Sequence, residues 1–179
     1  GEKVIDFTDT NLHIMGYSLP VDEVVGREEL LSHIYTQPNQ PDLIPYVTSF
    51  YKERWGFCMS DNQKNSLQDD NYRVLIDSDL KDGSLTYGEL IVPGKSKEEI
   101  LITSYLCHPS MANNELSGPV VLVELMKYVQ QLKNRRYTYR FVINPETIGS
   151  ITYLSKNIVT LQKNVKAGLL GGMSLSDIR

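Results

Sequence analysis

The sequence is poor in the residue types that mark several common classes of protein. It has two cysteines and three histidines in 179 residues, so we expect no disulfide framework, and any metal site must draw on few imidazoles. No apolar run approaches the roughly 18 residues that a membrane-spanning helix needs. Lys and Arg total 18 against 22 Asp and Glu, a formal net charge of -4, which argues against a nucleic-acid-binding surface.

Composition is otherwise that of a globular chain. Hydrophobic residues make up 41%, enough to bury a core and to exclude wholesale disorder. The length fits one domain, or a domain with a small appendage. The first residues do not form a secretory signal, and with so few cysteines we expect a cytoplasmic protein.

The first part of the chain predicts a small module of irregular and β structure. Residues 1 to about 70 are rich in Pro, Asp, Asn and aromatic residues, which favour turns. We expect a short helix at 27–34, a strand at 46–51 and an exposed polar loop at 61–70. Alternating segments at 72–77 and 85–92 flank a Lys-Asp-Gly-Ser turn, which predicts a β-hairpin.

From residue 100 onward, strands and helices alternate. The expected elements are a strand at 100–106, a helix at about 118–132, strands at 137–143 and 165–170, and a helix at 147–156. Ser117 or Gly118 would cap the first helix, with Pro119 in its first turn. This β-α-β-α-β order predicts an α/β fold with a parallel or mixed sheet flanked by helices. We place the boundary between residues 1–97, a mainly β module, and residues 98–179.

Polar side chains follow two of the predicted strands. His108 comes soon after the strand at 100–106, and Glu146 soon after the strand at 137–143. Because neighbouring parallel strands end at the same rim of a sheet, we expect these side chains to converge. Imidazole and carboxylate are zinc ligands, and a carboxylate beside a metal-bound water can act as a general base. The alternative is that His108 is hydrogen-bonded in a loop and Glu146 favours a helix N-terminus.

Two motifs resemble a known superfamily. His108-Pro109 and the run Ala-Asn-Asn-Glu-Leu-Ser-Gly at 112–118 are similar to the His-x-Asp and Ala-Asn-Asp-Asn-x-Ser-Gly elements of di-zinc aminopeptidases. Pro-Glu-Thr-Ile-Gly-Ser at 145–150 resembles their glutamate motif. The best match is a bacterial aminopeptidase-like family often associated with surface-polysaccharide or glycan biosynthesis. Its members carry an inserted, mainly β module in a zinc-exopeptidase-like fold, which residues 1–97 resemble.

The resemblance implies roles for individual residues. His108 would be a zinc ligand, Asn114 stands where the superfamily has a metal-bridging aspartate, and Glu146 would be a ligand or the general base. Glu115 could replace Asn114 after a shift of one residue. The implied activity is zinc-dependent hydrolysis of a peptide or of another small amide-containing substrate, with Glu146 taking a proton from water.

Three departures favour an alternative function. Asn114 is neutral, Ser110 replaces an aspartate that orients its partners, and no histidine follows His108. The alternative is a catalytically silent binding or assembly module on a peptidase scaffold. The chain also resembles a truncated member of the family. We therefore expect it to be inactive alone and to need a C-terminal half or a second copy to cover its apolar surface.

Other residues with chemical potential have structural explanations. We expect His13 and His33 to be exposed polar residues. Cys107 continues the alternation of the strand before it, which predicts a small buried side chain. The aromatic cluster of the first module is expected to form its core; its members are Phe50, Tyr51, Trp55 and Phe57.

Overall fold

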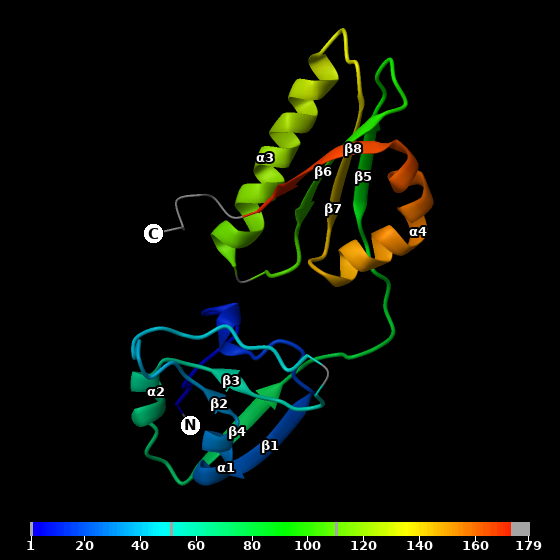
Figure 1. The fold of residues 1–179 in the computed structure, drawn as a ribbon. Coiled ribbons are helices and arrows are strands. Elements are labelled where there is room, and N and C mark those ends of the chain that lie inside the picture. Colours follow the sequence, from blue (N-terminus) through cyan, green and yellow to red (C-terminus); the bar gives the residue numbers. More distant parts are fainter. Residues whose placement is uncertain (1, 51, 110, 173–179) are drawn as a thin grey trace. The chain divides into compact units, whose positions relative to one another are not determined.

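The computed structural model describes residues 2–50, 52–109 and 111–172 and consists of two compact units (Figure 1). The units divide between Asp82 and Gly83. This division precedes the boundary expected at 97/98, since the strand that ends at Val92 pairs within the second unit and Val92 is buried in its core. Within the described part of the chain, no helix is both long and apolar enough to cross a membrane.

The first unit is built from short elements, as its turn-rich composition predicts. In chain order they are η1 (Asn11–His13), β1 (Val21–Gly26), α1 (Arg27–Ser32), β2 (Ile34–Tyr35), β3 (Phe57–Cys58), α2 (Asp61–Asn65) and β4 (Asn71–Ile76). Strands β1 and β4 pair antiparallel, with Val21 opposite Ile76, and β2 pairs parallel with β3. Helix α1 covers the β1–β4 ribbon through Leu30, which packs with Val25 and Val74.

Three local predictions for this region fail. The expected hairpin does not form, because β4 pairs with β1, whereas the following strand pairs within the second unit. The expected loop at 61–70 contains α2, whose first turn is closed by a reciprocal capping box between Ser60 and Gln63, and Leu67 beyond it is buried. The expected strand at 46–51 is reduced, over its described residues, to a bridge between Thr48 and Gly16; Tyr51 lies outside them.

The second unit has the predicted α/β architecture. Its elements are β5 (Gly88–Val92), β6 (Glu99–Tyr105), α3 (Ala112–Gln131), β7 (Thr138–Asn144), α4 (Ile148–Asn164) and β8 (Val165–Gly171). The strand order is β5-β7-β6-β8; β6 runs parallel to β7 and β8, and β5 runs antiparallel to β7. Alternation along β7 separates the two faces: Phe141 packs with α3 and Val142 with α4. The helices therefore cover opposite faces of one mixed sheet.

Helix α3 begins at Ala112, several residues before the predicted cap. Ser117, Gly118 and Pro119 consequently lie inside the helix, where Pro119 cannot donate the usual backbone hydrogen bond. Gly118 is required by packing: a Cβ there would lie 2.5 Å from Ser104 Oγ and 2.7 Å from the Gly171 carbonyl oxygen. The Ser-Gly pair therefore lets α3 approach β6 and β8 closely and does not mark the start of a helix.

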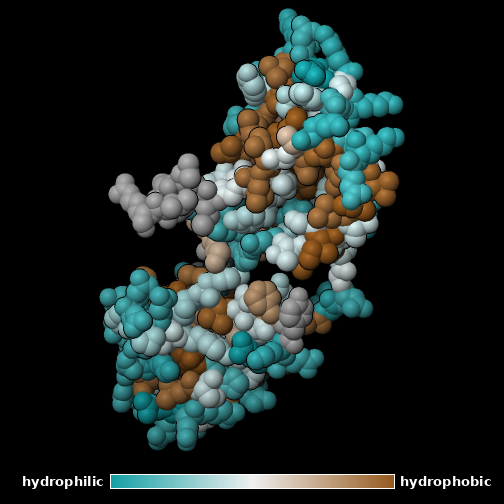
Figure 2. All heavy atoms as spheres, in the orientation of Figure 1, coloured by the Kyte–Doolittle hydropathy of each residue, from teal (hydrophilic) through white to brown (hydrophobic). Residues whose placement is uncertain are grey.

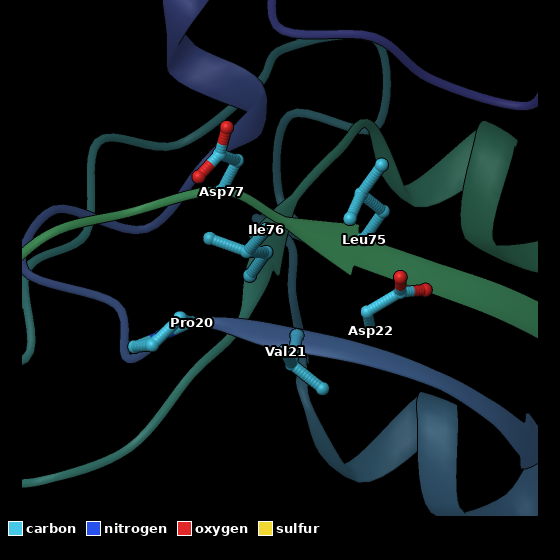
Figure 3. A pocket seen from close by; sticks show the side chains of 6 residues that line it. All are labelled: Pro20, Val21, Asp22, Leu75, Ile76 and Asp77. Carbon is cyan, nitrogen blue, oxygen red and sulfur yellow. The ribbon is translucent and has the colours of Figure 1, made fainter.

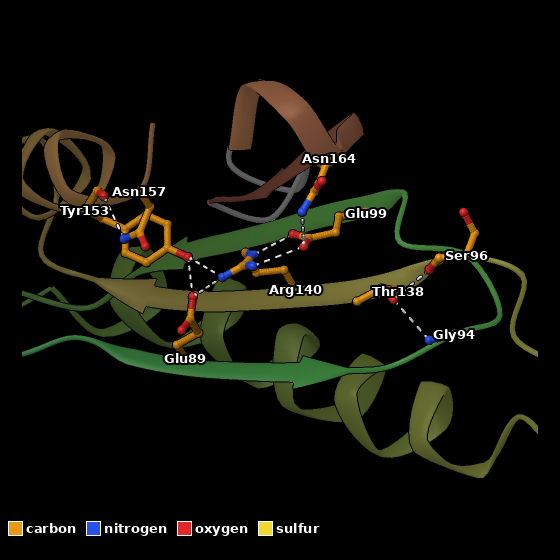
Figure 4. A network of polar contacts seen from close by, with 9 residues as sticks. All are labelled: Glu89, Gly94, Ser96, Glu99, Thr138, Arg140, Tyr153, Asn157 and Asn164. Atoms are coloured by element: carbon orange, nitrogen blue, oxygen red, sulfur yellow. Dashed lines mark hydrogen bonds and ion pairs between the residues drawn. The ribbon is translucent and has the colours of Figure 1, made fainter. Parts of the chain in front are cut away.

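A buried ionic network joins α4 to the sheet (Figure 4). The Arg140 guanidinium on β7 lies 2.6 Å from Glu99 Oε2 and 2.6 Å from Glu89 Oε1. Hydrogen bonding to Arg140 lowers the pKa of Glu99 even though burial opposes it. Tyr153 of α4 donates to Glu89, and burial, followed by this bond to an anion, raises its pKa to about 12. The Asn164 side-chain amide donates a hydrogen bond of 3.3 Å to Glu99. The network therefore connects β5, β6, β7 and α4.

Apolar side chains remain exposed on both helices and on one strand of this unit, and Figure 2 shows hydrophobic residues in brown on the face in view. The main ones are Val120, Val121 and Tyr128 on α3, Ile151 and Val159 on α4, and Leu169 and Leu170 on the edge strand β8. Exposed apolar patches of this kind mark contact surfaces. The expectation that further polypeptide or a second copy covers them stays a prediction.

We expect Arg140→Met to lower the free energy of unfolding by about 3 to 5 kcal/mol, because it leaves the buried Glu99 carboxylate without its cation. Urea denaturation followed by circular dichroism measures this change. Lys127→Met is the matched control, since its partner Glu124 is exposed, and it should cost less than about 1 kcal/mol. Equal losses in the two variants would contradict a special role for the buried pair.

The same network predicts a pH dependence. The pKa of Glu99 is depressed in the folded protein, so its stabilisation is present above the ordinary value of 4.5 and is lost as pH falls through the folded pKa. The stability difference between the native protein and Glu99→Gln should therefore be constant near neutral pH and shrink on acidification below 4.5. Unfolding curves at a series of pH values test this, and a difference independent of pH would rule it out.

Candidate metal centre at the ends of β6 and β7

The residues that follow β6 and β7 lie at the same rim of the sheet. Tyr105, the last residue of β6, lies opposite Asn144, the last residue of β7. Just beyond them, the Leu106 amide donates to the Asn144 carbonyl at 3.1 Å. The His108 Nε2 and Glu146 Oε2 atoms lie 3.8 Å apart. The predicted convergence of His108 and Glu146 is thus observed, while their roles as metal ligands stay predictions.

Glu115 is the carboxylate that contacts His108 most closely. It lies in the first turn of α3, is 3% exposed, and places Oε1 2.8 Å from His108 Nδ1. The Cys107 amide donates to its other oxygen. Burial alone would raise the pKa of Glu115, but hydrogen bonds from the backbones of Cys107 and His108 and from the His108 ring together lower it. The centre therefore holds a buried, ionised carboxylate.

The early start of α3 bears on the choice between Asn114 and Glu115. Neighbouring residues on a helix do not face the same way. Because Glu115 turns toward His108, Asn114 is directed elsewhere, and it is half-buried. The ligand role expected for Asn114 stays a prediction. Ser110, which takes the place of an orienting aspartate, lies outside the described residues.

Cys107 was expected to be buried, and that expectation is wrong. Strand β6 ends at Tyr105, so the alternation does not extend to Cys107, which is exposed. Its Sγ lies 3.0 Å from His108 Nδ1 and accepts a hydrogen bond of 3.3 Å from the Glu146 amide. Partial burial of the sulfur raises the pKa of the Cys107 thiol, and the carboxylates of Glu115 and Glu146 raise it further.

A strained turn presents Glu146. Thr147 has φ 56° and ψ -72°, and the Ile148 amide donates to the Glu146 carbonyl at 2.6 Å, which closes a γ-turn of the rare positive-φ type. Such strain in a β-branched residue is found mainly at functional sites. Gly149 permits the tight return of the chain, because a Cβ there would lie 2.7 Å from Pro145 Cδ. The Glu146 side chain is left 54% exposed at the rim.

The donor atoms present suit a zinc-type ion. One ligand atom each from Cys107, His108 and Glu115 can be chosen so that all lie within 4.8 Å of one another. Thiolate sulfur, imidazole nitrogen and carboxylate oxygen are all zinc ligands. The chemistry of this donor set therefore fits the metal that the sequence motifs imply.

The other two histidines serve the first unit. His13 is buried, with Nδ1 2.9 Å from the Cys58 carbonyl oxygen, so the expectation of an exposed ring is wrong. The reason is the turn η1, which directs the ring inward. His33 is half-buried and stacks on Trp55 with ring centroids 3.6 Å apart, so it is not the exposed residue that was expected. Trp55 and Phe57 pack against the core as predicted, whereas Phe50 is exposed.

An open groove of about 390 Å³ lies in the first unit at the end of the β1–β4 ribbon, where β1 begins and β4 ends (Figure 3). Its lining residues are Pro20, Val21, Asp22, Leu75, Ile76 and Asp77. Asp22 is paired with Arg73 at 2.9 Å, and the lining includes no histidine or cysteine. The groove therefore lacks the donor set found around His108.

Known proteins share this architecture. A 2.37 Å crystal structure from Clostridium acetobutylicum, provisionally named a peptidase, matches with a TM-score of 0.90 and 52% identity over 95% of this chain and 40% of its own. A protein of the same organism is 52% identical over 170 residues, which make up 95% of this chain and 39% of the relative. Its provisional name assigns it to polysaccharide biosynthesis and gives it an aminopeptidase-like domain.

The chain thus has a mixed α/β fold that it shares with a protein provisionally named a peptidase. The family model described as a domain of unknown function, DUF4910, matches residues 1–175, and the chain belongs to that family. It spans about two fifths of the length of these two relatives.

Glu115→Leu should change the tautomer of His108 in the metal-free protein. The carboxylate only accepts, so its contact with Nδ1 favours the form protonated at Nδ1, and the substitution removes that preference. Side-chain ¹⁵N chemical shifts of His108 report the tautomer. The shifts of His33, whose Nδ1 bonds to the Trp55 carbonyl, are the internal control. An unchanged His108 spectrum would show that Glu115 does not set the ring state.

Proposed function

We propose that this chain contributes a zinc site to an amide hydrolase, with His108 and Glu115 binding the metal and Glu146 acting as general base. The observation that supports this most is the position of the His108 ring between two carboxylates. Glu115 Oε1 lies 2.8 Å from Nδ1, and Glu146 Oε2 lies 3.8 Å from Nε2. An imidazole with carboxylates on both edges is suited to metal binding and proton transfer.

The different exposures of the two carboxylates suggest different roles. The Glu115 side chain is 4% exposed and accepts hydrogen bonds from backbone amides, as suits a fixed ligand. The Glu146 side chain is 54% exposed, so water and substrate can reach it. This contrast favours Glu146 as base over Glu146 as ligand. The γ-turn at Thr147 fixes the direction from which its carboxylate approaches.

A zinc ion held here would acidify bound water and polarise the substrate carbonyl. The residues of the chain would supply the remaining steps. Glu146 accepts the proton of the attacking water and returns it to the leaving amine, while His108 and Glu115 hold the ion. The buried Glu115 charge also offsets the charge of the ion.

The substrate class follows from the relatives. An aminopeptidase-like domain supports a peptide substrate, and the association with polysaccharide biosynthesis supports an amide on a sugar or glycan precursor. The chain spans 39% of that relative. We therefore propose that additional polypeptide supplies further parts of the active site, and that this chain alone does not hydrolyse amides.

A second candidate is a binding or assembly module on the same scaffold. Asn114 favours it, because a neutral amide cannot bridge and neutralise two zinc ions as the corresponding aspartate does. A binding module would retain its ligand after chelation, whereas a metallohydrolase would lose activity.

The test uses the protein at the full length of its relatives. Zinc content by mass spectrometry should approach stoichiometry and fall in His108→Ala. Glu146→Gln should keep the metal but lose hydrolysis of aminoacyl and sugar-linked amides by about 100-fold or more. The control is Glu124→Gln on the exposed side of α3. Absence of zinc, or full activity in Glu146→Gln, would refute the proposal.

A further inference from the structure

We propose that the Cys107 thiolate is the third protein ligand of the ion at His108, which makes the centre a mixed sulfur, nitrogen and oxygen site. This inference rests on the proposed metal function and adds a ligand that the sequence motifs do not supply. Its basis is the convergence of ligand atoms from Cys107, His108 and Glu115, all within 4.8 Å of one another.

The contacts of the His108 ring show where an ion would fit. Cys107 Sγ at 3.0 Å and Glu115 Oε1 at 2.8 Å approach the same ring atom, Nδ1. In the metal-free protein, the sulfur and the carboxylate oxygen both lie within hydrogen-bonding distance of Nδ1. A cation that takes the place of a hydrogen on Nδ1 meets all three donor atoms. With bonds of roughly 2.0 to 2.3 Å, ligands of one tetrahedral zinc lie roughly 3 to 4 Å apart, so only small shifts are needed.

The local backbone makes this convergence possible. Consecutive residues of a strand point to opposite faces, so Cys107 and His108 could not share a site within β6. Since β6 ends at Tyr105, Cys107 and His108 are not held in the alternating strand conformation, and both side chains lie at the rim. The Glu146 amide donates to Cys107 Sγ at 3.3 Å. An N–H directed at sulfur is the kind of outer contact that stabilises a bound thiolate.

Charge balance provides an independent argument. Asn114 does not supply the negative charge that the corresponding aspartate supplies in the superfamily. Glu115 provides one negative charge, and a second negative ligand would complete the neutralisation of a divalent ion in this partly buried site. A Cys107 thiolate supplies it. Three protein ligands then leave one position open, as in catalytic zinc centres that include cysteine.

Cobalt(II) is the probe for this ligand. Added to the metal-free protein, it should give visible d–d bands and a near-ultraviolet thiolate-to-cobalt charge-transfer band. Cys107→Ser should abolish the charge-transfer band and weaken zinc binding by more than about tenfold, the lower end of losses seen for outer-shell partners. Cys58→Ser is the matched control, because Cys58 is buried in the first unit, and it should keep the band. A soft ligand also predicts that zinc binds in preference to magnesium or manganese.

Alkylation of the unsubstituted protein tests the idea even if a variant does not fold. Zinc should slow iodoacetamide labelling of Cys107 at least tenfold, while the buried Cys58 stays unlabelled with or without metal. Cobalt d–d bands without the charge-transfer band, or labelling unaffected by bound zinc, would overturn the thiolate ligand and leave the metal proposal intact. Failure to bind either metal would overturn both.

Discussion

The parallel pairing of β6 with β7 is the constraint on which the site depends. Its register sets Tyr105 opposite Asn144, so both strands end together and their following residues leave from one rim. A shift of this register would separate His108 from Glu146, although neither residue lies in a strand. The sheet thus fixes a distance between side chains that are 38 positions apart in the sequence.

Buried charge is distributed around this sheet in two separate sets. Arg140 lies between Glu99 and Glu89 on the α4 side, where cation and carboxylates satisfy one another. At the rim, Glu115 is equally buried, but its contacts there are backbone amides and the His108 ring. A buried carboxylate that lacks a permanent cation among these contacts is suited to receive one. The first set therefore serves stability, and the second has the character of a binding site.

Much of the second unit could be predicted from the sequence, because its apolar periodicity is strong and local. The strands around Ile102 and Phe141 and the helix through Leu122 lie where the pattern indicates. The predicted pairing partner of β4 was wrong. Strand β4 alternates regularly, but alternation does not specify a partner, and β4 pairs with a segment some 50 residues earlier. The predicted start of α3 was also wrong. In the sequence, Ser117-Gly118 resembles a helix cap, but Gly118 lies inside α3, where it allows close packing on β6 and β8.

By itself, the sequence determined the α/β class, the rim position of His108 and Glu146, and the likeness to aminopeptidases, since these depend on periodicity and short motifs. Only the tertiary structure decided that Glu115 contacts the His108 ring and that Cys107 turns toward it. The reason is geometric. The direction of a side chain near the end of a strand or the start of a helix depends on the residue at which that element begins or ends. Here α3 begins at Ala112 and packs closely on β6 and β8 through Gly118, whereas the local sequence points to a later start.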